Sequence, residues 1–245
     1  MTSPARAHYL RTVAAQSAAA GAPEPLANAN AYELMLAQLA EHRRRLKQVQ
    51  SIERKIEAKR AMLPDYAPWV EGVLAGDAGV QDDVLMTVLV WRIDTGDLAG
   101  ALPLAEYALR HKLSLPDQYH RPLACLIAEE SADLALRQIA AEQPVDVASL
   151  VAVLTLTAEQ DMPDEVRARL LKALGYALRD SDKAGALSYL QQALARHEKV
   201  GVKKDIERLE RELKKEGPAD SPPATDQPPA DPPPATNQAP ATGEG

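Results

Sequence analysis

The sequence predicts an all-α fold on three observations. Apolar residues recur at helical spacing along most of the chain, and acidic residues, N-cap residues or prolines stand at the start of these stretches. No stretch combines strand-like alternation with β-branched enrichment. With 245 residues, of which 46% are hydrophobic, the chain can bury one good core in one or two domains.

The N-terminal part of the chain is expected to divide into two segments. Residues 1–27 are predicted to form a flexible arm, and residues 28–63 a long basic helix with coiled-coil character that ends at Pro64. The apolar stripe of this helix consists of Leu36, Leu39, Leu46, Val49, Ile52, Ile56 and Leu63. The sequence offers no obvious intramolecular partner to six of these residues, so we expect the chain to form a homo-oligomer through them: Leu36, Leu39, Leu46, Val49, Ile56 and Leu63.

Residues 64–216 are predicted to form a domain of α-helical hairpins. The expected helices span about 66–75, 83–94, 98–111, 122–141, 146–159, 164–179, 183–198 and 202–215. Several starts are marked by N-cap residues, first-turn acids or prolines, in "QDDV", "TGDL", "QPVD", "DMPDEV" and "DSDK". Short turns between these stretches favour antiparallel neighbours.

One hairpin pattern occurs twice. "TGDLAGALPLAEYAL" at 95–109 returns as "DSDKAGALSYLQQAL" at 180–194, an offset of 85 residues. Each copy places two alanines seven residues apart, which lets helix backbones approach closely, as in tetratricopeptide-like hairpins. Two such copies fit a compact helical bundle or a peptide-binding groove. In the first copy, Pro103 is expected to kink the second helix or to delay its start.

The last segment, residues 217–245, has the composition of a disordered tail. It holds nine of the nineteen prolines, four acidic residues and no Lys or Arg. The formal net charge of the chain is −7, so the remainder carries about −3, which neither favours nor excludes a nucleic-acid partner.

Positive charge is concentrated on one stretch, "EHRRRLKQVQSIERKIEAKR" at 41–60, which has eight basic residues against three acidic ones. Such a charged element suits phosphate contacts along a duplex. The other interpretation is a solvated coiled-coil face with ion pairs from Glu53 and Glu57. The candidate DNA-binding residues are Arg43, Arg44, Arg45, Lys47, Arg54, Lys55, Lys59 and Arg60.

No catalytic or metal motif is found. The chain lacks a P-loop, H-E-x-x-H and G-x-S-x-G, and the histidines are scattered, with only His120 and Cys125 near enough to suggest a metal pair. The acids Asp82, Asp83, Asp94 and Asp97 could belong to a nuclease, but about 16 Å separates the two ends of a helix over 83–94. Helix capping explains these acids more simply, so we expect no metal site and no cofactor.

The expected location is the cytoplasm. The single Cys125 suits a reducing compartment, and the longest apolar run, at 84–91, is less than half of a membrane span. The arginines and alanines of the N-terminus resemble a signal peptide only superficially, since Gln16 and Ser17 interrupt the apolar region.

Long stretches of the chain resemble one family. "MTSPARAHYLR", "LPDYAPWVEGVLAG", "GVQDDVLMTVLVWRIDTGDLAGALPLAEYALRHKLSLP", "DMPDEVRARLLKALGYALRD" and "GVKKDIERLERELKKE" resemble the small terminase subunit of temperate tailed phages of the Peduovirus type. The resemblance runs in order from residue 1 to about residue 216 and leaves out the tail.

The resemblance implies a subunit that binds cohesive-end, double-stranded phage DNA and directs its cutting and packaging, together with a large subunit that carries the ATPase. The missing P-loop agrees with that division. The family is commonly labelled the terminase endonuclease subunit, and two alternatives stay open. The chain could itself be a metal-dependent endonuclease, or it could be a helical-repeat scaffold with no nucleic-acid role.

Overall fold

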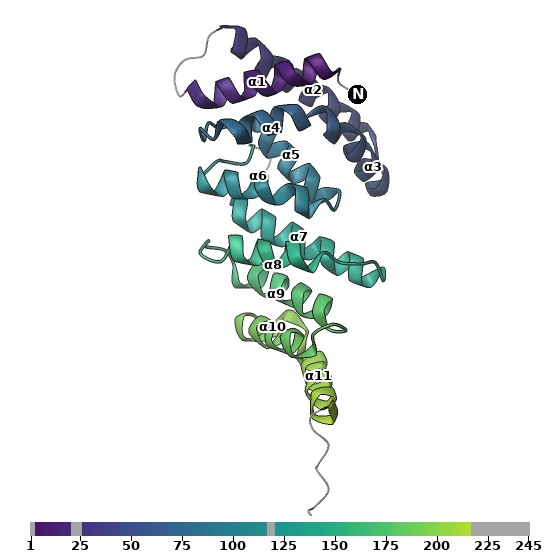
Figure 1. Ribbon diagram of the computed structural model, residues 1–245. Helices are drawn as coiled ribbons and strands as arrows, with labels where there is room; N and C mark the ends of the chain where they lie inside the picture. The colour runs from purple at the N-terminus through teal and green to yellow at the C-terminus, as the bar shows by residue number, and fades with distance from the viewer. Residues whose placement is uncertain (1–2, 21–25, 117–120, 217–245) are drawn as a thin grey trace, which may run out of the picture.

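The computed structural model describes residues 3–20, 26–116 and 121–216. These ranges contain eleven α-helices, two short 3₁₀ turns and no strand, which confirms the all-α prediction. The helices stack one after another into an elongated molecule with α1 at one end and α11 at the other (Figure 1). In the part of the chain that is described, no helix has the length and apolar character needed to cross a membrane.

The N-terminal third is organised differently from the expectation of an arm and one long helix. Its elements are α1 Pro4–Ala20, α2 Leu26–Gln48, α3 Ile52–Met62, the 3₁₀ turn η1 Leu63–Asp65 and α4 Ala67–Gly76.

The segment predicted to be a flexible arm over 1–27 contains helix α1, which packs against α4. Leu10, Val13 and Ala14 are buried there. The two backbones lie so close that a Cβ on Gly72 would collide with the carbonyl oxygen of Arg11. The alanine-rich sequence favours helix, and this contact supplies the packing that an isolated helix of this length lacks in water.

The helix predicted over 28–63 is broken in two between Gln48 and Ile52. Ser51 has an extended backbone, with φ −68° and ψ 131°, and its side chain accepts a hydrogen bond from the Arg54 backbone N–H, which starts α3. A serine offers this local alternative to continuous helix. The break turns the basic stretch into two helices (Figure 1).

The rest of the described chain agrees closely with the predicted helices. The observed elements are α5 Asp83–Asp94, α6 Leu98–Arg110, α7 Leu123–Ala140, α8 Val147–Leu156, α9 Asp164–Leu178, α10 Lys183–Arg196, the 3₁₀ turn η2 Glu198–Val200 and α11 Lys203–Glu216. The predicted start signals at Asp82, Asp97, Asp146 and Asp182 are confirmed as N-caps, because each carboxylate accepts a hydrogen bond from a backbone N–H of the first turn.

The repeated pattern corresponds to the turns and second helices of the α5–α6 and α9–α10 hairpins. Asp97 accepts from Gly100 N–H at 2.9 Å, and Asp182 accepts from Gly185 N–H at 2.9 Å. A Cβ at either glycine would meet the end of the capping carboxylate, so the aspartate side chain would have to shift to admit it. The paired alanines of both copies are buried at helix contacts: Ala101, Ala108, Ala186 and Ala193. Pro103 lies inside α6 and does not delay its start at Leu98.

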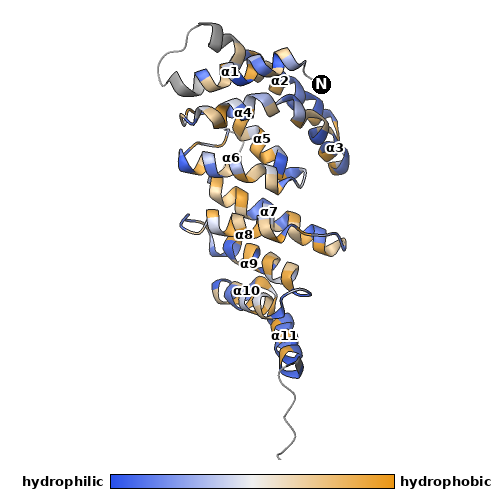
Figure 2. Ribbon diagram, in the orientation of Figure 1, coloured by the Kyte–Doolittle hydropathy of each residue, from blue (hydrophilic) through white to orange (hydrophobic). Residues whose placement is uncertain are grey.

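The main apolar core runs from α1 to α9, and α5 passes through it with nine of its twelve residues buried. A second cluster joins α10 and α11 through Leu190, Ile206 and Leu209. Figure 2 shows the apolar colouring concentrated on α5, α7 and α8, while much of α3 and α11 is hydrophilic. The disordered tail predicted over 217–245 lies outside the described residues.

Candidate nucleic-acid interface

Helix α2 is fixed to the stack along one face. Ala31, Met35, Leu39, His42 and Leu46 follow each other at steps of three or four residues and are all buried. The Nδ1 atom of His42 lies 2.8 Å from the Tyr66 hydroxyl, and burial lowers the pKa of this histidine. His42 therefore serves packing as a neutral ring, and the opposite face of α2 is left to solvent.

Three of the eight candidate basic residues are bound to α5 or to its end. Arg43 Nη2 donates to Thr87 Oγ1 at 2.5 Å. Lys59 Nζ pairs with Asp94 Oδ2 at 2.5 Å, and Arg60 Nη2 donates to the Thr95 carbonyl oxygen at 2.8 Å. These bonds attach α2 and α3 to the stack, and Lys59 and Arg60 also complement the C-terminal end of the α3 dipole.

The other five basic residues form what we call the outer basic set: Arg44, Arg45, Lys47, Arg54 and Lys55. Arg44 and Arg45 pair with Glu41 on their own helix, at 2.7 and 3.1 Å, and their side chains are 72% and 63% exposed. Lys47, Arg54 and Lys55 make no ion pair with any residue of the described ranges. One carboxylate thus serves two arginines, and most of the positive charge of the set faces solvent.

The apolar stripe on which self-association was predicted is largely used within the chain. Leu39 and Leu46 are buried in the main core, and Leu36 and Leu63 pack against it. Ile52 is 76% exposed at the start of α3, and Val49 and Ile56 are half-buried. Sequence reasoning missed the packing of α2 and α3 on α5, because α5 lies far along the chain from α2.

The four acids considered for a nuclease site have structural partners or lie at separate ends of α5. Asp82 caps α5 and accepts from Trp69 Nε1 at 2.8 Å, and burial raises the pKa of its carboxyl. Asp97 caps α6 and pairs with Arg92 at 2.5 Å. Asp94 pairs with Lys59, and Asp83 lies in the first turn of α5. Among the described residues, no three His, Cys, Asp or Glu side chains converge as metal ligands.

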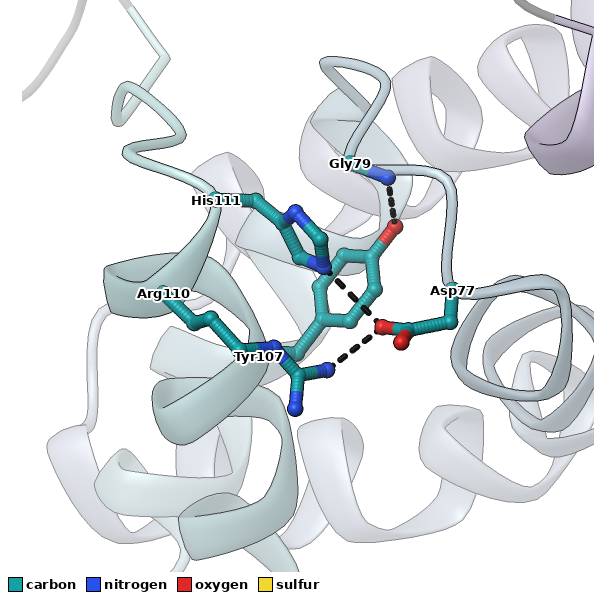
Figure 3. A network of polar contacts seen from close by, with 5 residues as sticks. All are labelled: Asp77, Gly79, Tyr107, Arg110 and His111. Atoms are coloured by element: carbon teal, nitrogen blue, oxygen red, sulfur yellow. Dashed lines mark hydrogen bonds and ion pairs between the residues drawn. The ribbon is translucent and has the colours of Figure 1, made fainter.

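A polar network that sequence reasoning missed ties the α4–α5 loop to the end of α6 (Figure 3). Asp77 Oδ1 contacts Arg110 at 2.5 Å and His111 Nε2 at 3.0 Å, while Gly79 N–H donates to the Tyr107 hydroxyl at 2.9 Å. The contact with His111 lowers the pKa of the Asp77 carboxyl. A scattered histidine gives no signal for such a pair, since its partner is 34 positions away.

The metal pair considered for His120 and Cys125 is not placed by the structure. Cys125 is buried on α7, and His120 lies outside the described residues.

Two comparisons with known proteins agree. The family described as phage small terminase subunit matches residues 36–165. A curated relative from Escherichia phage P2, named "Terminase, endonuclease subunit", is 51% identical over 215 residues, which are 87% of this chain and 87% of the relative. No solved structure matches. The matched residues include the outer basic set, α3 and the part of α2 from residue 36 onward.

Proposed function

Because the chain belongs to the phage small terminase subunit family, we propose that it binds the double-stranded DNA to be packaged through the outer basic set. In this role it presents cohesive-end DNA to a large subunit that carries the ATPase, and it directs the cutting there rather than performing it. The family membership supports a part in phage DNA packaging, and the charge distribution supports the choice of surface.

The main support for this surface is that the eight basic residues fall into two groups, one bound to the end or side of α5 and one without such bonds. If α2 and α3 needed positive charge only for attachment, the bonds made by Arg43, Lys59 and Arg60 would suffice. Four members of the outer basic set are exposed and Lys55 is half-buried, and Glu41 is the ion-pair partner of Arg44 and Arg45. Lys and Arg side chains exposed in this way bind phosphates by releasing counterions.

The test is DNA binding by the variant Arg44→Glu with Lys47→Glu, measured at several salt concentrations. We expect affinity to fall about tenfold or more for cohesive-end and random duplexes alike, because phosphate contacts position a protein without reading bases. The slope of log affinity against log salt should decrease by about one for each phosphate that the variant no longer neutralises.

A matched control moves the same charge change to the other end of the stack. Lys199→Glu with Lys204→Glu alters two exposed lysines near the start of α11 and should leave DNA affinity nearly unchanged. The neutral variant Arg44→Gln with Lys47→Gln should weaken binding in the same direction but less. Equal losses in the control and the test variant would contradict a specific role of α2.

Endonuclease activity is the second candidate, because the phage P2 relative carries "endonuclease subunit" in its name. The acids that could have served a nuclease have structural roles instead: Asp82 caps α5, and Asp94 and Asp97 form ion pairs. This supports a role in directing DNA cutting by another subunit. We expect the purified protein with Mg²⁺ or Mn²⁺ to leave cohesive-end DNA intact and cutting to require the large subunit. Divalent-dependent cutting by the protein alone, abolished by Asp94→Asn, would establish the second candidate.

Homo-oligomerisation also stays a prediction. Several copies of the outer basic set on one duplex would raise weak phosphate contacts to useful avidity. The side chains of the apolar stripe that remain accessible to another copy are exposed Ile52 and half-buried Val49 and Ile56.

A further inference from the structure

A hollow of about 470 Å³ lies where α3 and η1 meet the turn between α5 and α6. It is lined by Arg60, Leu63, Pro64, Ala67, Arg92, Thr95 and Asp97. The volume falls in the range of about 300–1,000 Å³ that is usual for small-ligand sites. The hollow adjoins the basic helix α3, since Arg60 belongs to the last turn of that helix.

The polar side of the hollow carries an excess of positive charge. Arg60 donates one bond to the Thr95 carbonyl oxygen at 2.8 Å, and Arg92 Nη1 pairs with Asp97 at 2.5 Å. The Nε atom of Arg92 is buried and has no hydrogen-bond partner among the described residues. Two guanidinium groups against one carboxylate leave a net charge of +1 and unused N–H donors.

The other side of the hollow is apolar, being formed by Leu63, Pro64 and Ala67. A free inorganic anion would gain nothing from this surface. A nucleotide matches both sides of the hollow, because its phosphate accepts hydrogen bonds from N–H donors and the carbon atoms of its sugar can pack against an apolar surface. Arginine is well suited to the phosphate because its planar group donates two parallel bonds.

We propose that this hollow binds one nucleotide of a DNA strand, with the phosphate on Arg60 and Arg92 and the sugar against Leu63 and Pro64. The inference rests on the proposed DNA-binding function and adds a second contact point to the outer basic set. The phosphate can be an internal diester or a terminal monoester, because both present the oxygens that guanidinium groups bind.

The test compares Ala67→Glu with Ala67→Gln, using the dinucleotide pTpT as the probe and amide and arginine N–H chemical shifts as the readout. Residue 67 is the first residue of α4, where a glutamate is favourable to the helix, so the fold should be kept. Both variants fill the hollow to the same extent, but only glutamate adds charge. We expect pTpT to bind the glutamate variant about tenfold more weakly than the glutamine variant.

A gain of affinity provides the second arm. Asp97→Asn keeps an N-cap side chain on α6 but removes the negative charge from the hollow. It should bind pTpT about threefold or more tightly than the parent protein. A merely structural role of Asp97 predicts no such gain. Comparing pTpT with TpT, which lacks the terminal phosphate, distinguishes the two sources: equal binding indicates the diester, and loss with TpT indicates the monoester.

Equal pTpT affinities of the glutamate and glutamine variants, or no gain with Asp97→Asn, would overturn this inference. Failure of the proposed function gives a different result, namely duplex affinity that survives charge reversal in the outer basic set. The hollow is therefore tested with pTpT and the Ala67 and Asp97 variants, whereas the proposed function is tested with duplex DNA and variants of the outer basic set.

Discussion

Helices α5 and α2 lie in contact, but they use their sequences in opposite ways. Helix α5 buries every residue from Val84 to Trp91, together with Ile93, and its two ends are held by Asp82 and by Lys59. Helix α2 buries a single face and turns Arg44, Arg45 and Lys47 to solvent. Figure 2 shows a similar contrast between α5, which is mostly apolar, and α3, much of which is hydrophilic.

Buried residues such as those of α5 hold the helices together, whereas exposed residues such as those on the outer face of α2 are available to a binding partner. A helix buried along most of its surface leaves little of it for recognition, so substitutions at its buried residues should act on stability. A helix packed on one side can change its outer face with little cost to the fold, and its substitutions should act on binding. A residue on the outer face of α2 that proves essential for stability would contradict this comparison.

The largest expected effect is at the centre of α5. Leu89→Ala leaves a cavity at a fully buried position and should lower the free energy of unfolding by about 2–5 kcal/mol. Leu34→Ala on α2, where the side chain is 67% exposed, should change it by less than about 0.5 kcal/mol. Urea denaturation followed by circular dichroism measures both, and similar losses in the two variants would contradict the contrast.

An intermediate effect is expected at the repeated helix cap. Asp182→Ala removes the acceptor for Gly185 N–H and should lower the free energy of unfolding by about 0.5–2 kcal/mol, whereas Asp182→Asn should restore most of it. Hydrogen exchange should show faster exchange at the start of α10. Unchanged exchange there would mean that the shared Asp-x-x-Gly sequence has no capping role.

The smallest effect concerns the network of Asp77, which lies at the surface (Figure 3). Contact with His111 lowers the pKa of Asp77 in the folded protein, so its contribution to stability exists above the unfolded pKa of 3.8 and is lost as pH falls through the folded value. Asp77→Asn suits the left-handed backbone at this position, φ 45°. Its melting temperature should lie slightly below that of the parent at about pH 6, and the gap should narrow as the pH falls below the unfolded pKa of 3.8. A gap that widens on acidification would contradict this.

Sequence reasoning predicted the hairpin part of the fold well. Acidic N-caps such as Asp97 and Asp182 and the apolar runs behind them are local signals, and the structure keeps them because the packing agrees with them. The missed elements depend on distant contacts. Helix α1 has few large apolar residues and gains its place by close packing on Gly72, and the break at Ser51 interrupts a stripe that reads as continuous helix.

The candidate site was predicted only as a set of residue types. The concentration of positive charge over 41–60 is visible in the sequence. The attachment roles of Arg43, Lys59 and Arg60 are not, because their partners lie on α5 or at its end: Thr87, Asp94 and Thr95. The hollow beside Arg60 escaped prediction for the same reason, since Arg92 is 32 positions away in the sequence.

The most direct test of the DNA-binding role is the variant Arg54→Glu with Lys55→Glu, measured for unfolding and for duplex affinity in parallel. Glutamate at 54 completes a capping box with Ser51, and both new acids lie in the first turn of α3, where negative charge is favourable. We therefore expect stability equal to or above that of the parent and a fall in duplex affinity of about tenfold or more, with a flatter salt dependence. Duplex affinity and salt dependence equal to those of the parent would contradict the assignment of the outer basic set to DNA.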